Sequence, residues 1–217
     1  LGKITPPDGE EGDEFGESVS VSGNLVAIGA EGTDRDDEED AGAAYLYRVE
    51  DNGSVTHLAT ITAPDGEEGD EFGESVSVSG NILAIGADDA DLQEKSSVGA
   101  VYLFRVEDDG SVSYLTKVTA PDGDEDDCFG WSISHSGSLL AIGAPWADVG
   151  EESDAGAGYL YRLEANGSVT HLAKVTAPDS AEDDEYGKSV SVSGNIVAIG
   201  AGGTDLYGKE DAGAAYL

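Results

Sequence analysis

The alternation of apolar and polar residues predicts short β-strands along the chain, and no segment has a helical period of useful length. Within residues 15–64, the segment 18–22 alternates serine with valine, as expected for a strand with one buried face. The segment 25–30 is almost wholly apolar, which indicates a strand that is covered on both faces. Residues 43–48 are rich in aromatic side chains, and residues 56–63 alternate alanine and isoleucine with threonine. We therefore expect four strands in this stretch.

Two tight turns and one polar loop separate these four strands. Gly23-Asn24 is a turn pair between the first and second strands, and a polar loop over 31–41 joins the second to the third. Asn52-Gly53 indicates a hairpin before the fourth strand, because this pair tolerates positive φ at both central positions. Four short strands in meander order are typical of one blade of a β-propeller.

The same pattern recurs four times at a spacing of 57 residues, without a change of register. A regular repeat indicates one supersecondary unit stacked on copies of itself. The sequence therefore predicts an all-β fold, a single β-propeller domain over 1–217 with four-stranded antiparallel blades. A β-solenoid is the alternative, but its coils are usually shorter and lack two acidic loops per turn. The four repeats span residues 1–57, 58–114, 115–171 and 172–217.

The two ends of the chain complement each other in this pattern. Residues 2–7 match the fourth strand at 59–64, and the last repeat stops inside its third strand. We expect the first strand to complete the last blade and to hide two sheet edges. It does so either within one molecule, which closes a ring, or in a neighbouring molecule, which builds a polymer. The same positions of the two ends within the repeat also fit a fragment of a longer propeller.

The charge of the chain restricts its partners. The 217 residues include 46 acidic and 10 basic ones, a net charge of −36. This argues against DNA, RNA and anionic membrane surfaces, because phosphate binding needs clustered Lys and Arg. It favours cations, basic partners or a high-salt environment. No apolar run has membrane-spanning length, so we expect no membrane insertion.

Forty of the 46 carboxylates lie in two kinds of loop, which join the fourth strand to the next first strand and the second strand to the third. In a meander these loops leave the sheet on the same side, so one face of the molecule is expected to be acidic. Oxygen-rich loops of this kind suit Ca²⁺. The alternative is the solvated acidic surface of a salt-adapted protein, with the aspartates that directly follow a proline, Asp8, Asp65, Asp122 and Asp179, serving as turn formers. The candidate ligands are the aspartates present in all four repeats: Asp8, Asp65, Asp122 and Asp179; Asp13, Asp70, Asp127 and Asp184; Asp34, Asp91, Asp148 and Asp205.

Other chemistry is sparse in the sequence. The single cysteine, Cys128, replaces the glutamate at positions 14 and 71, and we expect a surface or half-buried thiol. Asn52 and Asn166 begin glycosylation sequons at equivalent hairpin tips, although the same residues also suit a turn followed by serine. We find no Ser-His-acid set, no phosphate-cradling glycine loop and no zinc-spaced His/Cys group, so no enzymatic activity is expected.

These repeats resemble the FG-GAP repeat family, which forms the blades of integrin α-subunit propellers and of many bacterial and archaeal surface proteins. The signature is FGESV at 72–76, AIGA at 84–87 and GAVYLF at 99–104, and it covers all four repeats. The resemblance implies an extracellular or cell-surface β-propeller for adhesion, ligand binding or assembly. Integrin-type repeats carry an aspartate-rich Ca²⁺ loop between the first and second strands, where this chain has only Ser79-Gly80-Asn81. The family's metal ligands therefore cannot be transferred, and any Ca²⁺ would use the other acidic loops.

Two functions follow from this reading as hypotheses. The first is a structural or adhesive propeller that self-assembles by strand completion, with cations screening its acidic face. Its partners would be further copies of itself or an extracellular protein or glycan. The alternative is a Ca²⁺-dependent, lectin-like module that binds glycans through its loop face.

Overall fold

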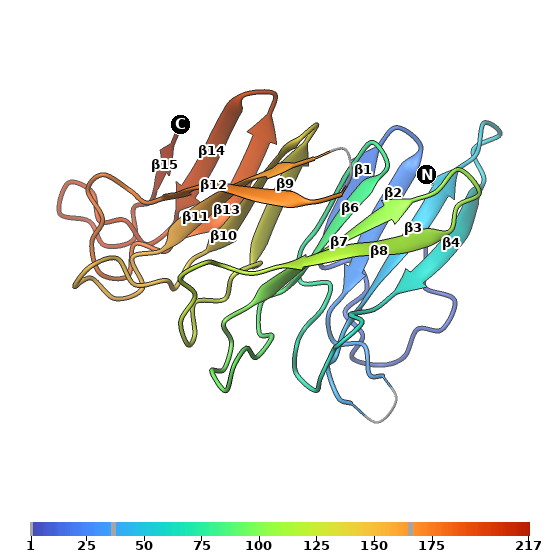
Figure 1. Ribbon diagram of the computed structural model, residues 1–217, viewed down its shortest axis with the longest axis horizontal. Helices are drawn as coiled ribbons and strands as arrows, with labels where there is room; N and C mark the ends of the chain where they lie inside the picture. The colour runs from blue at the N-terminus through green and yellow to red at the C-terminus, as the bar shows by residue number, and fades with distance from the viewer. Residues whose placement is uncertain (1, 36–37, 165–166) are drawn as a thin grey trace.

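The computed structural model describes residues 2–35, 38–164 and 167–217, and every regular element in these ranges is a β-strand (Figure 1). None of the described residues belongs to a helix that could cross a membrane. The strands are β1 (Val19–Ser22), β2 (Leu25–Ala30), β3 (Ala43–Val49), β4 (Val55–Ile61), β5 (Val76–Ser79), β6 (Ile82–Ala87), β7 (Ala100–Val106), β8 (Val112–Val118), β9 (Ser132–Ser136), β10 (Leu139–Ala144), β11 (Ala157–Leu163), β12 (Val169–Val175), β13 (Tyr186–Ser193), β14 (Ile196–Ala201) and β15 (Ala214–Tyr216).

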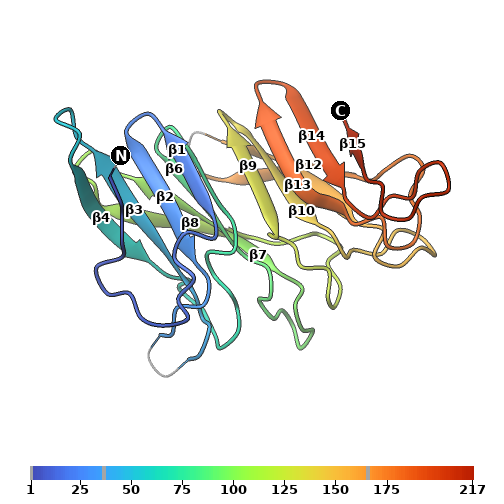
Figure 2. The same ribbon diagram turned by 180° about the vertical axis from the view of Figure 1, so that it is seen from behind.

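The strands form four antiparallel meander sheets, which are the blades of a four-blade β-propeller and confirm the predicted fold. Blade 1 is β1–β4, blade 2 is β5–β8, blade 3 is β9–β12, and blade 4 is the three-stranded sheet β13–β15. The blades stand side by side in chain order, and the first strand of each lies next to the first strand of the following blade. The long loops leave on one side and the short turns on the other, as predicted (Figure 2).

The burial of each strand follows its sequence. The apolar β2, β6 and β10 lie in the middle of their sheets and are buried along most of their length, as expected for strands covered on both faces. The hairpin after β3 does not contain the predicted turn, in which Asn52 and Gly53 would both have a positive φ. Only Gly53 has a positive φ, 83°, and its N–H donates to the carbonyl of Glu50 at 2.8 Å. The glycine thus follows the turn, in the left-handed conformation that it adopts easily.

The hydrophobic core consists of layers between neighbouring blades. Phe72 and Phe129, at the start of blades 2 and 3, are fully buried. The Phe72 ring meets Tyr102 edge-to-face with centroids 5.4 Å apart, and Phe129 meets Tyr159 in the same way at 5.3 Å. Both rings also belong to core clusters that include strands of the preceding blade, so each blade depends on the next blade to cover its sheet.

The N-terminal segment lies on blade 1. Ile4 packs against the blade, and the Tyr47 hydroxyl donates to the carbonyl of Thr5 at 3.2 Å. The two ends of the chain lie at opposite ends of the molecule (Figure 1), so the described residues do not show strand completion within one chain. The prediction that the segment completes a blade of a neighbouring molecule stays open.

Candidate functional site

Each blade inserts a Phe-Gly or Tyr-Gly pair, here called the plug, into a pair of glycines on the preceding blade, here called the socket. At the junction of blades 1 and 2, the plug is Phe72-Gly73 and the socket is Gly29 and Gly42. A Cβ atom on Gly29 would lie 1.9 Å from the Gly73 carbonyl oxygen, and one on Gly42 would lie 2.2 Å from that of Phe72. The glycines are required because backbone occupies the space of a side chain. The later junctions use Gly86 and Gly99 with Phe129-Gly130, and Gly143 and Gly156 with Tyr186-Gly187.

A ladder of serine hydroxyls joins the innermost strands of neighbouring blades. Ser18 donates to the carbonyl of Gly73 at 2.7 Å, and Ser20 and Ser22 accept the N–H groups of Val78 and Gly80, both at 3.0 Å. The serine face of β1 thus points at blade 2. The same three bonds recur at the next two junctions, from Ser75, Ser77 and Ser79 to blade 3 and from Ser132, Ser134 and Ser136 to blade 4.

The array of blades has two outer faces, one on blade 1 and one on blade 4. Each carries one half of this junction, and in the structure no neighbouring blade covers it. On blade 1, Val19 and Val21 are 65% and 66% exposed, whereas their equivalents Val76 and Val78 on blade 2 are 7% and 5% exposed. On blade 4, Ile196 is 59% exposed, whereas its blade 1 equivalent Leu25 is 8% exposed. We call these surfaces the leading face (blade 1) and the trailing face (blade 4).

The trailing face contains a socket without a plug. Its glycines, Gly200 and Gly213, line a cavity of about 440 Å³ together with Lys188, Ser189 and the first two residues of β15. The three atoms nearest to a Cβ on Gly200 would all belong to Ser189, whereas at the other junctions the nearest atom is a carbonyl oxygen of the plug. The leading face offers the matching plug, Phe15-Gly16, with the glycine exposed. The structure therefore places an unused plug and an unused socket on its two outer faces.

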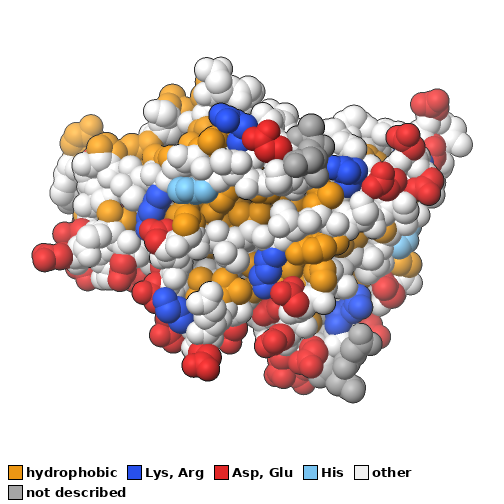
Figure 3. Space-filling model, in the orientation of Figure 1, with side chains coloured by type: hydrophobic (Ala, Val, Ile, Leu, Met, Phe, Trp, Pro, Cys, Tyr) orange, Lys and Arg blue, Asp and Glu red, His pale blue; other side chains and the backbone are white. Residues whose placement is uncertain are grey.

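Acidic side chains gather along the margin where the long loops lie (Figure 3). The twelve predicted metal-binding aspartates all lie in these loops, and most accept hydrogen bonds that hold the backbone. Four of them are buried and accept the N–H of the residue three positions earlier at 2.7–2.9 Å: Asp13, Asp70, Asp127 and Asp184. Four accept the N–H of the residue six positions later at 2.9–3.2 Å: Asp34, Asp91, Asp148 and Asp205.

The remaining set, which begins with Asp8, bonds to side chains of the following blade. Asp122 accepts the Tyr159 hydroxyl at 3.0 Å and pairs with Lys174 at 2.9 Å. Asp65 pairs with Lys117 at 3.1 Å, Asp179 accepts the Tyr216 hydroxyl at 2.8 Å, and Asp8 lies beside Tyr45. No three of the twelve aspartates bring their ligand atoms within 4.8 Å of one another in the structure as described. Calcium binding by these residues stays a prediction.

The structure describes one of the two predicted glycosylation sites. Asn52 lies exposed at its hairpin tip, and its side-chain oxygen accepts the N–H of Ser54 at 2.8 Å. Asn166 lies outside the described residues. Modification of either asparagine stays a prediction.

Two glutamates face each other at the junction of blades 1 and 2. Burial raises the pKa of both Glu31 and Glu74, and the two carboxyl groups share a hydrogen bond. The neighbouring carboxylates of Glu14, Glu17 and Glu71, together with Asp88, raise these pKa values further. Sharing one proton relieves the repulsion that two half-buried carboxylates would otherwise suffer.

This pair predicts a stability that falls as the pH rises. A carboxyl group with a raised pKa in the folded state binds its proton more tightly there than in the unfolded chain, where the pKa is about 4.3. The stabilisation is therefore complete below about pH 4.3 and is lost as the pH rises through the folded pKa. Thermal unfolding between pH 5 and pH 9 should show a falling midpoint, with a shallower slope in Glu31→Gln because the amide needs no proton. An equal slope in both proteins would contradict this.

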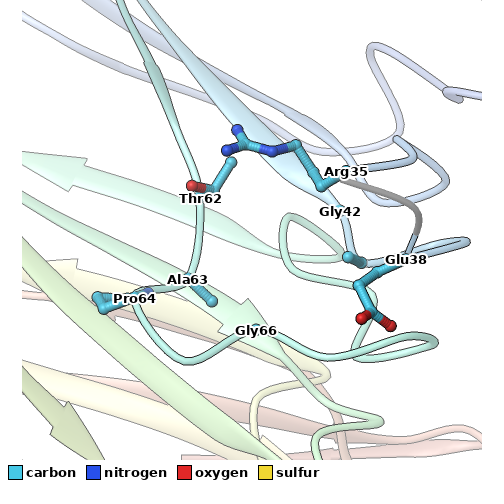
Figure 4. Close-up of a pocket in the computed structure, with 8 residues that line it drawn as sticks. Arg35, Glu38, Gly42, Thr62, Ala63, Pro64 and Gly66 are labelled. Atoms are coloured by element: carbon cyan, nitrogen blue, oxygen red, sulfur yellow. The ribbon is translucent and has the colours of Figure 1, made fainter.

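A shallow cavity of about 370 Å³ lies between the β2–β3 loop of blade 1 and the connection that leads to blade 2 (Figure 4). Arg35 and Glu38 line one side, and Thr62, Ala63 and Pro64 line the other. Its wall is largely backbone and small side chains, so its chemistry selects no particular ligand.

The fold and its repeated junction define the class of this protein as a β-propeller. The family model for the FG-GAP repeat matches residues 1–47, 55–104, 113–161 and 169–217, and the chain belongs to this family. FG-GAP repeats are typical of extracellular and cell-surface proteins. A comparison with curated proteins finds no match.

Among solved structures, the crystal structure of the computationally designed Ika4 protein is similar, with a TM-score of 0.56. The match covers 100% of this chain and 98% of that chain at 14% sequence identity. At this identity, the similarity supports the fold alone.

Proposed function

We propose that this chain is a non-enzymatic structural module of the cell exterior that joins copies of itself, leading face to trailing face. The observation that carries the proposal is the pair of complementary outer faces. The plug Phe15-Gly16 of one copy enters the socket at Gly200 and Gly213 of the next. The interface is then one more copy of the junction that already occurs three times within the chain.

Three kinds of contact support this interface. The exposed Val19 and Val21 would be covered like Val76 and Val78, which removes apolar surface from water. The exposed serines of β13, Ser189, Ser191 and Ser193, correspond in sequence to those that bond the next blade at every internal junction. Both outer faces thus offer the groups that the opposite face lacks.

Backbone groups complement each other in the same way. At the first junction, the N–H groups of Gly69, Glu71 and Phe72 donate to the carbonyls of residues 39–41 at 2.9, 3.1 and 3.3 Å. The corresponding donors on the leading face are Gly12, Glu14 and Phe15, and the corresponding acceptors on the trailing face are residues 210–212.

The N-terminal segment fits the same arrangement. The carbonyl of Thr5 accepts a hydrogen bond from the Tyr47 hydroxyl of blade 1. In the same way, the carbonyl of Thr119, which directly follows β8 of blade 2, accepts one from the Tyr161 hydroxyl of blade 3. Residues 2–6 therefore lie against blade 1 as the end of a preceding blade's fourth strand would. Docking of blade 1 onto blade 4 of another copy would bring this segment beside the edge strand β15.

A head-to-tail interface is heterologous, so it builds closed rings where the rotation closes and open filaments where it does not. Like charges gather on the loop margin, and cations would be needed to screen them between neighbouring copies. We therefore expect assembly to strengthen with ionic strength.

Sedimentation velocity over a range of concentrations and salt tests the proposal. We expect species at multiples of 22.2 kDa for the wild-type chain and a single 22.2-kDa species for Gly200→Ala. The added methyl group would occupy the place of the Gly16 carbonyl, as a Cβ on Gly29 would meet Gly73. The control Tyr114→Ser removes an exposed apolar side chain from an outer strand and should assemble normally. A monomeric wild-type chain at every salt concentration would overturn the proposal.

A further inference from the structure

The junction of blades 2 and 3 brings together the one cysteine of the chain and two aspartates. Asp88 and Asp89 directly follow β6, and Cys128 precedes the plug Phe129-Gly130 of blade 3. One ligand atom from each of the three side chains lies within 4.8 Å of the other two, and no other such group occurs among the described residues. The sequence predicted a surface or half-buried thiol, and this was wrong: Cys128 is 6% exposed.

The backbone fixes the thiol in this position. Cys128 has a φ of 51°, in the left-handed region, and its N–H donates to the carbonyl of Ser97 at 3.0 Å. The equivalent residues Glu14, Glu71 and Glu185 share this conformation, so it belongs to the repeat and not to the cysteine. The repeat thus presents the side chain at this position to the loop that follows the second strand of the preceding blade.

Asp88 provides an independent observation that points to a ligand. It is only 1% exposed, and its Oδ1 atom is buried without a hydrogen-bond partner. An orphaned carboxylate oxygen in the interior is costly, and a bound cation is one way to satisfy it. Burial, and next the charge of Asp89, raises the pKa of Asp88 to about 8, and burial also raises the pKa of the Cys128 thiol.

We propose that Asp88, Asp89 and Cys128 form a binding site for a thiophilic divalent cation of the Zn²⁺ class. The Cys128 Sγ atom lies 3.6 Å from Oδ1 of Asp89. Tetrahedral Zn²⁺ with ordinary Zn–S and Zn–O bonds separates these two ligand atoms by about 3.5 Å. A thiolate favours Zn²⁺ over Ca²⁺ or Mg²⁺, which prefer oxygen ligands. Three protein ligands leave a fourth position for water.

The site is specific to this junction. The residues equivalent to Asp88 and Asp89 are Glu31 and Gly32 on blade 1, and Pro145 and Trp146 on blade 3. On blade 3, Trp146 packs edge-to-face against Trp131 with ring centroids 4.7 Å apart, which leaves apolar surface where blade 2 has carboxylates. One metal ion per chain is therefore expected. Because the cation would bridge blades 2 and 3, it would also stabilise their junction.

Titration with Co²⁺, a spectroscopic substitute for Zn²⁺, tests the site directly. In high monovalent salt, which suppresses loose binding to the acidic loops, we expect one equivalent of Co²⁺ to produce a thiolate-to-cobalt charge-transfer band. One equivalent of Zn²⁺ should abolish this band. Cys128→Ser and Asp88→Asn should each lose the band, and circular dichroism is used to check that both variants fold.

Glu185→Gln is the matched control, because it changes the position equivalent to Cys128 at the junction of blades 3 and 4. It should retain both the band and the stoichiometry. Absence of a charge-transfer band in the folded wild-type chain would overturn the proposal, and so would an unchanged band in folded Cys128→Ser.

Discussion

Replacement of Phe129 by alanine is expected to lower the free energy of unfolding by about 3–5 kcal/mol, the usual cost of emptying a fully buried phenylalanine site. Phe129 is the plug that blade 3 inserts into blade 2, and it packs against Tyr159 and Tyr161 of its own blade. Its loss would leave a cavity between two blades that otherwise cover each other. Urea unfolding followed by tryptophan fluorescence would measure the change.

The repeat supplies a matched control for this prediction. Phe15 occupies the same register in blade 1, yet it is only half-buried because no neighbouring blade covers it in the structure. Phe15→Ala should therefore cost clearly less than Phe129→Ala. Both are best measured in the Gly200→Ala background, since assembly would add its own free energy to the unfolding equilibrium. Equal losses for the two variants would contradict the plug-and-socket description.

A methyl group added at Gly143 is expected to destabilise the chain by about 3 kcal/mol, at the upper end of the range typical of overpacked cores. The Cβ of an alanine there would lie 1.9 Å from the carbonyl oxygen of Gly187. Backbone must move to relieve this clash, because a carbonyl of the neighbouring plug cannot rotate away as a side chain can. Thermal unfolding by circular dichroism would measure the loss as a lower midpoint.

Gly200 is the equivalent glycine on the trailing face and serves as the control. The nearest atom to a methyl group added there would be the Ser189 hydroxyl oxygen, at the end of a side chain that can rotate. Gly200→Ala should therefore leave the midpoint of the monomeric chain close to its starting value. A large loss at Gly200, or none at Gly143, would show that contact with the next blade does not set the requirement for glycine.

The sequence predicted the strands, the repeat and the acidic loop side because each follows from local pattern. The segment 25–30 matches β2 residue for residue, and four recurring plugs mark the start of each blade. The role of the serines could not be predicted in the same way. Alternating serine and valine shows that a strand has two unlike faces, but not that the serine hydroxyls bond the next blade.

The candidate site was less accessible to sequence reasoning. Recurrence of the aspartates suggested metal ligands, and the structure shows a role that the recurrence did not reveal: Asp13 and Asp70 each hold their loop by accepting a backbone N–H. Cys128 and Asp88 are 40 positions apart in two different repeats, and neither recurs at the equivalent position of another repeat, so no periodic signal joins them. The aligned repeats did offer one hint: the cysteine replaces a glutamate in the loop that abuts the preceding blade.

Mixing two assembly-deficient variants tests the central claim most directly. Phe15→Asp should destroy the plug and keep the socket, whereas Gly200→Ala should block the socket and keep the plug. Each variant alone should sediment as a 22.2-kDa monomer, and an equimolar mixture should form a dimer with one copy of each, because one intact plug meets one intact socket. If the mixture stays monomeric while the wild-type chain assembles, the copies join through other surfaces and the account is contradicted.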